Sequence, residues 1–157
     1  MGARGFRRYA KSEYRLNLTD QEAGVYRESF FRSYPGLATW HRRVRSRRTS
    51  ETRTLAGRRR LLDDKTPDTH RLNTPVQGTG ADGLKIALAL LWKRRDRVPG
   101  AFPVLVVHDE IVVETDECQA DSAAAWLKAA MLDAMAPLLD PVPVAVEIKI
   151  GRTWGED

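Results

Sequence analysis

The sequence is short of several features that would assign it to a particular class of protein. It contains a single cysteine, Cys118, so no disulfide forms within the chain, which suits a reducing cytoplasm. Its longest unbroken apolar run, residues 86–92, falls far short of the roughly 20 residues that cross a bilayer. The basic N-terminus, residues 1–11, has no apolar segment behind it and does not resemble a secretory signal. We therefore expect a cytoplasmic protein with no membrane partner.

Acidic residues are scarce in the first part of the chain. Residues 1–60 carry 16 Arg or Lys against 5 Asp or Glu, whereas residues 61–157 carry 10 against 16. A basic half of this kind favours contact with a polyanion such as nucleic acid, and guanidinium groups suit phosphate in particular. The alternative is a basic surface that reflects codon bias alone. With 157 residues, the chain is long enough for one domain with a real core.

The first half predicts helices joined by basic, polar segments. Thr19 and Glu22 have the spacing of a capping box, which starts a helix. Tyr26 and Phe30 recur behind it at helical spacing, and we expect these aromatic side chains to lie in the core. A second helix follows the Tyr-Pro-Gly stop at residues 34–36. The polar segment after it contains an Arg triplet, which is either a solvated run or a DNA contact on a short hairpin.

The second half predicts a different mixture of elements. A helix begins at Asn73 or Thr74, with proline in its first turn. Gln77 lies one turn after Asn73, so both amides project from one side of the helix. Such a pair either forms hydrogen bonds with the edges of bases or holds a neighbouring loop of the protein in place. Residues 117–135 predict another helix, with Leu127 and Met131 on its apolar stripe. The strict alternation of apolar residues over 142–150 predicts a half-buried strand.

Between these helices lies the stretch VLVVHDEIVVE, residues 104–114. Two β-branched runs separated by His108, Asp109 and Glu110 predict a tight antiparallel hairpin. Adjacent carboxylates on an otherwise buried pair of strands must be solvated, paired or bound to a cation, because bare burial is costly. A polar turn with no further role is the alternative, since turns favour aspartate in any case.

These elements indicate an α+β fold. The second half forms an antiparallel sheet, made of the hairpin at 104–114 and the C-terminal strand at 142–150, with helices packed on it. A helical segment precedes this sheet. We expect two domains, residues 1–70 and residues 71–157.

Four sequence segments together resemble the family-A DNA polymerases, the bacterial DNA polymerase I type. They are RRR at 58–60, LNTPVQGTGAD at 72–82, LVVHDEIVVE at 105–114 and VEIKIGRTW at 146–154. The N-terminal part is similar to the family's fingers region, just past its nucleotide-binding helix. The resemblance covers essentially the whole chain. It implies that the second half is the C-terminal part of the palm, and that the protein is a cytoplasmic, nucleoid-associated DNA polymerase.

The resemblance implies roles for the residues of the hairpin turn. Asp109 matches the family's second metal-binding aspartate, Glu110 a supporting acid that is less essential, and His108 a residue that contacts the primer end. Nucleotidyl transfer from a dNTP to the primer 3′ end uses two Mg²⁺ ions, roughly 3.5–4 Å apart. Mg²⁺ prefers hard oxygen ligands and takes one or two protein carboxylates, of which Asp109 is expected to be one.

The resemblance also implies contacts with primer–template DNA. Gln77 and Asn73 match residues that touch the DNA minor groove behind the active site. All base pairs present hydrogen-bond acceptors there, so such contacts can test the shape of a base pair without reading its sequence. Arg58 matches a basic contact to the primer strand or minor groove. The family's usual arginine four residues before Asn73 is Thr69 in this sequence, and Arg71 is the nearby basic residue that we expect to contact DNA in its place.

Other departures from the family are larger. The palm's first aspartate, on its DYSQIE-like strand, is absent from the 157 residues, and so is the helix that binds the incoming dNTP. Val106 stands where the family usually has glutamine. We therefore expect a fragment or a split subunit that is inactive alone and needs an upstream polymerase segment as a partner.

Two other functions fit parts of the same sequence. A non-catalytic DNA-binding remnant that uses the Arg-rich half as a clamp predicts salt-sensitive binding of duplex DNA that does not require Asp109. A Mg²⁺-dependent nuclease is the weaker alternative, because such sites need several clustered carboxylates and the hairpin turn offers only Asp109 and Glu110.

Overall fold

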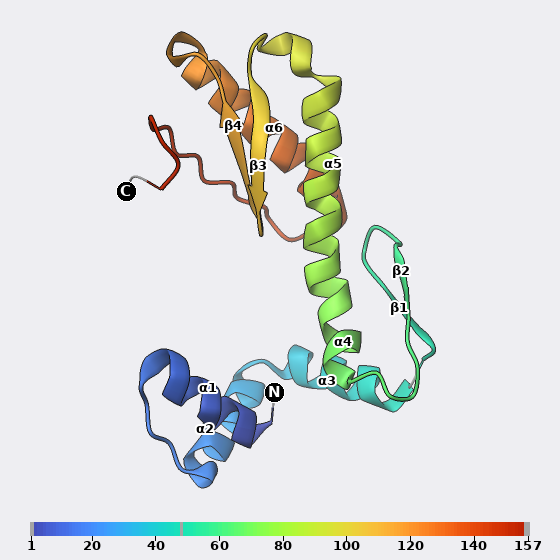
Figure 1. The fold of residues 1–157 in the computed structure, drawn as a ribbon. Helices are drawn as coiled ribbons and strands as arrows, with labels where there is room; N and C mark the ends of the chain where they lie inside the picture. Colours follow the sequence, from blue (N-terminus) through green and yellow to red (C-terminus); the bar gives the residue numbers. More distant parts are fainter. Residues whose placement is uncertain (1, 48, 156–157) are drawn as a thin grey trace. The chain divides into compact units, whose positions relative to one another are not determined.

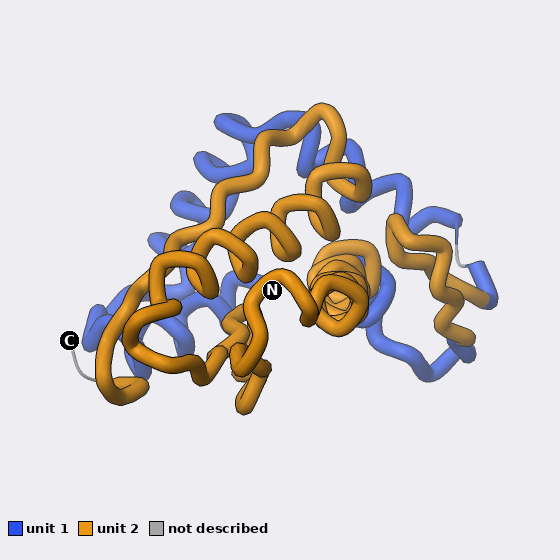
Figure 2. Tube along the Cα trace, turned by 90° about the horizontal axis from the view of Figure 1, so that it is seen from above, with its two compact units in different colours: residues 1–50, 62–72 blue, residues 51–61, 73–157 orange. Residues whose placement is uncertain are grey.

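The computed structural model of the chain describes residues 2–47 and 49–155. The chain divides into two compact units, coloured separately in Figure 2. Unit 1 consists of residues 1–50 and 62–72, and unit 2 consists of residues 51–61 and 73–157. The segment 51–61 therefore belongs to the second unit, although residues of the first flank it on both sides. The expected division into domains 1–70 and 71–157 stays a prediction.

Unit 1 is helical, as expected. Its helices before residue 50 are α1 (Ala3–Tyr14), α2 (Asp20–Ser33) and α3 (Pro35–Arg47). The predicted capping box is confirmed: the Glu22 N–H donates to Thr19 Oγ1 at 3.2 Å, and the Thr19 N–H donates to the Glu22 carboxylate at 2.8 Å. The bond from the Thr19 backbone lowers the pKa of Glu22. The next helix begins at Pro35 itself, a residue favoured in the first helical position.

Few side chains of unit 1 are buried within this chain. Ala10 and Ala23 are buried, but Tyr26 is 58% exposed and Phe30 is 49% exposed. The expectation that these two aromatic side chains lie in a core is therefore wrong. Helical spacing predicts which residues share a face of a helix, but it does not predict whether another element covers that face.

Unit 2 opens with a short antiparallel hairpin that contains the Arg triplet. Its strands are β1 (Glu51–Arg53) and β2 (Arg59–Leu61). The turn between them is closed by Gly57, whose φ of +87° lies in the left-handed region that favours glycine. The Gly57 N–H donates to the Thr54 carbonyl at 3.0 Å. The predicted hairpin is thus confirmed, whereas the expected contact of the Arg triplet with DNA stays a prediction.

A helical run follows. It comprises α4 (Asp68–Asn73), most of which belongs to unit 1, and the π-helical turn η1 (Thr74–Gly78) and α5 (Thr79–Lys93) of unit 2. The prediction that this helix starts at Asn73 or Thr74 is wrong: Asn73 has helical dihedral angles, and its side chain makes no cap hydrogen bond. The start signal lies earlier, at Asp68, where an acidic side chain in the first turn suits the helix dipole. Pro75 has no N–H to donate, and the run widens into a π-turn around it.

The core of unit 2 lies between α5 and the elements that follow it (Figure 1). These elements are η2 (Arg95–Arg97), β3 (Phe102–Val107), β4 (Glu110–Glu114), η3 (Glu117–Gln119) and α6 (Ala120–Leu139). The buried cluster combines small and large side chains, so the two helices approach closely: Ala87, Leu91, Val98, Ala101, Ile111, Ala123, Trp126, Ala130 and Ala134. The Trp126 indole N–H donates to the Arg94 carbonyl at 3.1 Å and satisfies its polar atom.

The buried face of α6 is shifted from the predicted stripe. Leu127 and Met131 pack at the margin of the core and are only half-buried, whereas Trp126 and Ala130, one position earlier, are buried. Both sets have helical spacing, because an apolar helix offers two adjacent stripes. Contact with the small residues of α5 selects the stripe that carries the alanines.

The C-terminal strand predicted over 142–150 is absent. The described chain forms no strand after α6, and Figure 1 shows this segment as an irregular trace. The predicted alternation is present only in the middle of the segment. Val144, Val146 and Ile148 are half-buried and the residues between them are exposed, but Val142 and Ile150 are exposed as well. Period-two patterning thus identified part of the packed face, but a strand also needs a partner strand, and within the described residues this segment pairs with none.

The hairpin of β3 and β4 forms as predicted, but it is not a buried pair of strands. Ile111 of β4 is 7% exposed, whereas Val104, Leu105 and Val106 of β3 are 47%, 41% and 40% exposed. Successive strand residues face opposite sides of a sheet, so both faces of β3 are uncovered in this chain. Within the described residues β3 pairs only with β4, which leaves its other hydrogen-bonding edge open. None of the described helices is both long and apolar enough to cross a membrane.

Two glycines of α5 provide a matched test of the helix packing. A Cβ at Gly80 would meet no atom within 4 Å, whereas a Cβ at Gly83 would lie 1.8 Å from Met135 Sδ on α6. We expect Gly80→Ala to raise the free energy of unfolding by roughly 0.5–1 kcal/mol. Gly83→Ala should lose that gain, because Met135 must be displaced. Urea denaturation measures both, and equal stabilisation by the two substitutions would contradict the close approach of α5 and α6.

Candidate functional site

The hairpin of β3 and β4 ends in a two-residue turn. Val107 and Glu110 are the last paired residues, so His108 and Asp109 form the turn itself. His108 has a φ of +54°, in the left-handed region that side chains with a Cβ adopt only at a cost of about 1–3 kcal/mol. Strained backbone of this kind clusters at functional sites. Glycine or asparagine would be the unstrained choice at this position of a two-residue turn.

The turn presents its polar side chains to solvent. His108, Asp109 and Glu110 are all exposed. Since Ile111 faces the core, Glu110 lies on the opposite face of the strand, away from α5 and α6. Among the described residues, no three His, Cys, Asp or Glu side chains come together in a group that could hold a metal ion. The donor set of this chain thus fits one or two ligands of a Mg²⁺ ion but not a complete two-metal site.

Arg58 lies in a second cluster, where the hairpin of β1 and β2 packs against the helical run. Its Nε donates to Asp82 Oδ1 at 2.6 Å, and its Nη2 donates to the Gly78 carbonyl at 3.2 Å. The Arg58 N–H donates to Thr54 Oγ1 at 3.0 Å. A side chain at Gly78 would bring a Cβ within 2.6 Å of Thr54, so only glycine permits this approach. Arg58 is thus held in place on two sides while half of its side chain stays exposed.

Asp82 is the anionic member of this cluster. Its side chain is only 9% exposed, and burial acts to raise its pKa. Hydrogen bonding from Thr54 and Arg58, together with the positive charges of Arg58 and Lys85, outweighs burial, and the pKa is lowered. Its Oδ2 atom is buried without a hydrogen bond from the described residues. The carboxylate therefore stays ionised, and its charge is balanced by Arg58.

Asn73 and Gln77 are both exposed, as expected for side chains that contact an external ligand. They lie four residues apart on either side of the start of η1, and no hydrogen bond with a described residue engages either amide. Gln77 lies within the π-helical turn η1, and such turns are often found at functional sites.

Arg71 is placed differently. It is only 7% exposed, and it donates hydrogen bonds to the carbonyls of Thr49 and Asp63. These contacts satisfy backbone acceptors inside unit 1. Its geometry suits a structural role better than contact with an external ligand.

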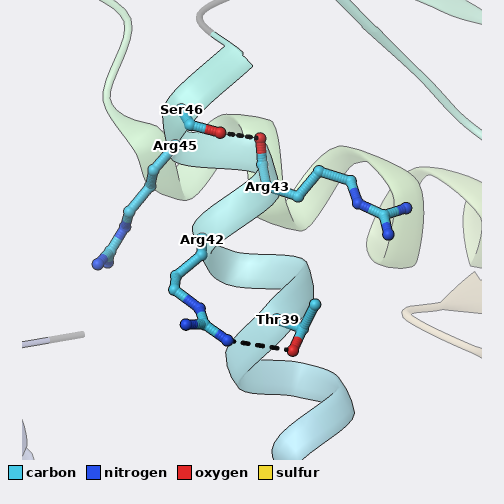
Figure 3. A pocket seen from close by; sticks show the side chains of 5 residues that line it. All are labelled: Thr39, Arg42, Arg43, Arg45 and Ser46. Carbon is cyan, nitrogen blue, oxygen red and sulfur yellow. Dashed lines mark hydrogen bonds between the residues drawn. The ribbon is translucent and has the colours of Figure 1, made fainter.

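The surface of α3 is strongly basic. An open hollow of about 640 Å³ is lined by three arginines and two hydroxyl residues: Thr39, Arg42, Arg43, Arg45 and Ser46. Figure 3 shows the side chains of Arg43 and Arg45 extending to opposite sides of the helix. The guanidinium groups do not converge on one point, so this surface suits an extended polyanion better than a single small anion.

Comparison with known proteins places these features in one family. The sequence model of DNA polymerase family A matches residues 8–156. The chain belongs to DNA polymerase family A.

Individual relatives agree with this assignment. The chain is 37% identical over 166 residues to DNA polymerase I of Aquifex aeolicus, a match that covers all of this chain and 28% of that protein. It is 34% identical over 161 residues to the thermostable DNA polymerase I of Thermus aquaticus, covering 93% of this chain and 19% of that protein. The chain thus spans less than a third of the length of these polymerases.

A solved family-A polymerase domain shares the fold. The POL domain of Pol1 from M. smegmatis, in complex with DNA primer-template and dNTP, matches with a TM-score of 0.65 at 28% identity. The match covers 77% of this chain and 24% of that domain. The α+β fold, with two small antiparallel sheets and packed helices, is therefore that of part of a polymerase domain.

Sequence reasoning missed one member of the Arg58 cluster. Asp82 is separated from Arg58 by 24 residues, and a helical pattern does not reveal which residue of a distant hairpin meets it. A signal was nevertheless present, because Asp82 lies beside Gly83 on the buried face of a mostly apolar helix of this family-A chain. A carboxylate in that position needs a partner.

The pH dependence of stability tests the charge of Asp82. Because its folded pKa is lowered, its contribution is present above the unfolded value of about 3.9 and is lost as pH falls through the folded pKa. The free energy of unfolding should therefore fall below about pH 4 more steeply in wild type than in Asp82→Asn. Urea denaturation between about pH 2.5 and pH 7 measures this difference. Parallel curves for the two proteins would contradict an ionised Asp82 in the folded state.

Proposed function

We propose that this chain is the distal part of the catalytic domain of a template-directed DNA polymerase, which transfers a nucleotide from dNTP to a primer 3′ end. The observation that carries the proposal is the strained, exposed turn of His108 and Asp109 at the tip of the β3–β4 hairpin. The structural neighbour that shares this fold is in complex with DNA primer-template and dNTP, which supports these partners.

The acidic residues of the turn have distinct roles in this proposal. Asp109 supplies one carboxylate ligand of the metal site, and Glu110, on the face of β4 away from the core, supports the local negative charge. Two Mg²⁺ ions, when bound, lower the pKa of the primer hydroxyl and stabilise charge on the phosphate oxygens. The remaining carboxylate ligands come from outside the described residues, because those residues contain no group of three candidate ligands.

An upstream polymerase segment is the partner that completes the site. Both faces of β3 are exposed, and its outer edge has unpaired backbone groups in the described chain. An apolar edge strand of this kind is stabilised by pairing with another strand. The half-buried alternation of Val144, Val146 and Ile148 also lacks a neighbouring strand. A sheet that includes the missing palm strand would satisfy both segments.

The DNA contacts are assigned to residues that the structure leaves accessible. Asn73 and Gln77 present amides from the helical run, Arg58 presents a held guanidinium, and His108 lies in the turn beside Asp109. The minor groove shows hydrogen-bond acceptors in all base pairs, which amide and guanidinium donors can contact without reading sequence. The arginines of α3 add contacts with phosphate.

A second candidate is a non-catalytic DNA-binding remnant of such a polymerase. The basic surface of α3 and the lack of a metal-binding group among the described residues favour it. It requires duplex binding that weakens with salt, but it requires no role for Asp109.

A chimaeric polymerase separates the two candidates. We would replace the matching segment of the Aquifex aeolicus DNA polymerase I with this chain and measure single-nucleotide incorporation on a primed template. The chimaera should incorporate dNTP. Asp109→Asn should lower the rate by about 100-fold or more, because losing a metal ligand removes several kcal/mol of charge stabilisation.

The control is Glu110→Gln in the same chimaera, which should cost less than Asp109→Asn because Glu110 is the supporting acid. A folded chimaera that binds the primed template but incorporates nothing would favour the remnant. Equal activity of the wild-type and Asp109→Asn chimaeras would remove Asp109 from the active site.

A further inference from the structure

The contacts of Arg58 determine what kind of ligand this arginine can serve. Its Nε is bound to Asp82 at 2.6 Å, and its Nη2 to the Gly78 carbonyl at 3.2 Å. A guanidinium is planar, so fixing two of its nitrogens fixes the direction of the third. No described residue forms a hydrogen bond with Nη1, and the side chain is half exposed. Arg58 thus offers solvent a donor with a defined direction.

The charge of this donor is already balanced. Asp82 is an ionised carboxylate, nine-tenths buried, in direct contact with the guanidinium. The pair therefore carries no net charge. Phosphate binding gains affinity by releasing counterions, and this gain requires an uncompensated cation. An uncharged acceptor gains from a directed N–H without needing net charge.

We infer that Asp82 is a positioning residue that makes Arg58 a directed, charge-compensated hydrogen-bond donor to an uncharged acceptor of duplex DNA, on a base edge or sugar in the minor groove. This rests on the proposed contact between the chain and DNA. The arginines of α3 supply the ionic attraction to DNA. Arg58 supplies a hydrogen bond that forms only when an acceptor lies in the direction of its free N–H. Asp82, the buried aspartate of α5, holds and neutralises Arg58.

A second set of hydrogen bonds, made by Thr79, holds the same hairpin without contacting the guanidinium of Arg58. The Leu55 N–H donates to Thr79 Oγ1 at 2.9 Å, and the Thr79 hydroxyl also bonds to the Pro75 carbonyl. Thr79→Val keeps the shape of the side chain and removes both bonds. It therefore loosens the hairpin while leaving Arg58 and Asp82 in place, and it serves as the control for a merely structural effect.

The test uses the 157-residue chain and a fluorescent primer–template duplex with a recessed 3′ end. Dissociation constants are measured over a series of salt concentrations for wild type, D82N, the double variant R58Q/D82N and T79V. The double variant keeps the net charge of the wild-type pair. It should bind about five- to tenfold more weakly at every salt concentration, for the loss of one hydrogen bond, with an unchanged slope of log Kd against log salt.

D82N keeps an oxygen that can accept from Arg58 Nε but leaves the guanidinium charge uncompensated. Its salt slope should steepen by up to about 0.9, the value for one additional phosphate contact. T79V should bind close to wild type. Circular dichroism establishes whether each variant is folded. If the double variant is unfolded, the salt slope of D82N alone tests the inference.

The remaining outcomes overturn the inference. Equal affinity of R58Q/D82N and wild type shows that Arg58 makes no contact with DNA. An unchanged slope in D82N shows that Asp82 does not neutralise Arg58. A loss in T79V as large as that in the double variant assigns the effect to hairpin docking. A wild-type chain that binds no duplex contradicts the proposed DNA contact itself, which distinguishes that failure from the others.

Discussion

The close packing of α5 against α6 is the contact on which unit 2 depends. Ala87 of α5 and Ala130 and Ala134 of α6 are almost fully buried, and a Cβ at Gly83 would collide with the side chain of Met135 on α6. Small residues let helix backbones approach, and the space beside them is filled by Leu91 and Trp126. Burial of this kind contributes roughly 25 cal/mol per Å² of apolar surface.

This helix pair positions both groups of polar residues. Ile111 anchors the β3–β4 hairpin to the helices through one face of β4, and the turn of His108 and Asp109 extends beyond that anchor. At the start of α5, Thr79 and Asp82 hold the β1–β2 hairpin and Arg58. The proposed metal ligand and the proposed DNA contact both need a rigid support of this kind, because a displacement of about 1 Å is costly in catalysis.

Much of this arrangement follows from the sequence, but unevenly. The capping box at Thr19 and the hairpin at residues 104–114 were predictable, since each is fixed by residues close in sequence. The Arg58–Asp82 pair was not, because it depends on how a hairpin meets a helix 24 residues away. Local patterns specify elements and faces, whereas contacts between distant elements are set by packing.

Three of the failed predictions share one physical cause. Tyr26 and Phe30 were expected in a core, β3 in a buried sheet and residues 142–150 in a strand, and each assignment needs a neighbouring element to cover or pair with the segment. The apolar patterns were read correctly as packing surfaces. In the described chain these surfaces lack part of their cover, which agrees with a chain that spans less than a third of its polymerase relatives.

The central claim is that Asp109 is one carboxylate of a metal site completed by an upstream polymerase segment. Counting bound Mn²⁺ by electron paramagnetic resonance, in the chimaera with primer–template and dNTP, tests it without depending on turnover. We predict about two ions per complex in wild type, as a two-metal site requires, and at least about tenfold weaker binding of one of them in Asp109→Asn. The same number and affinity of bound ions in both proteins would contradict the claim.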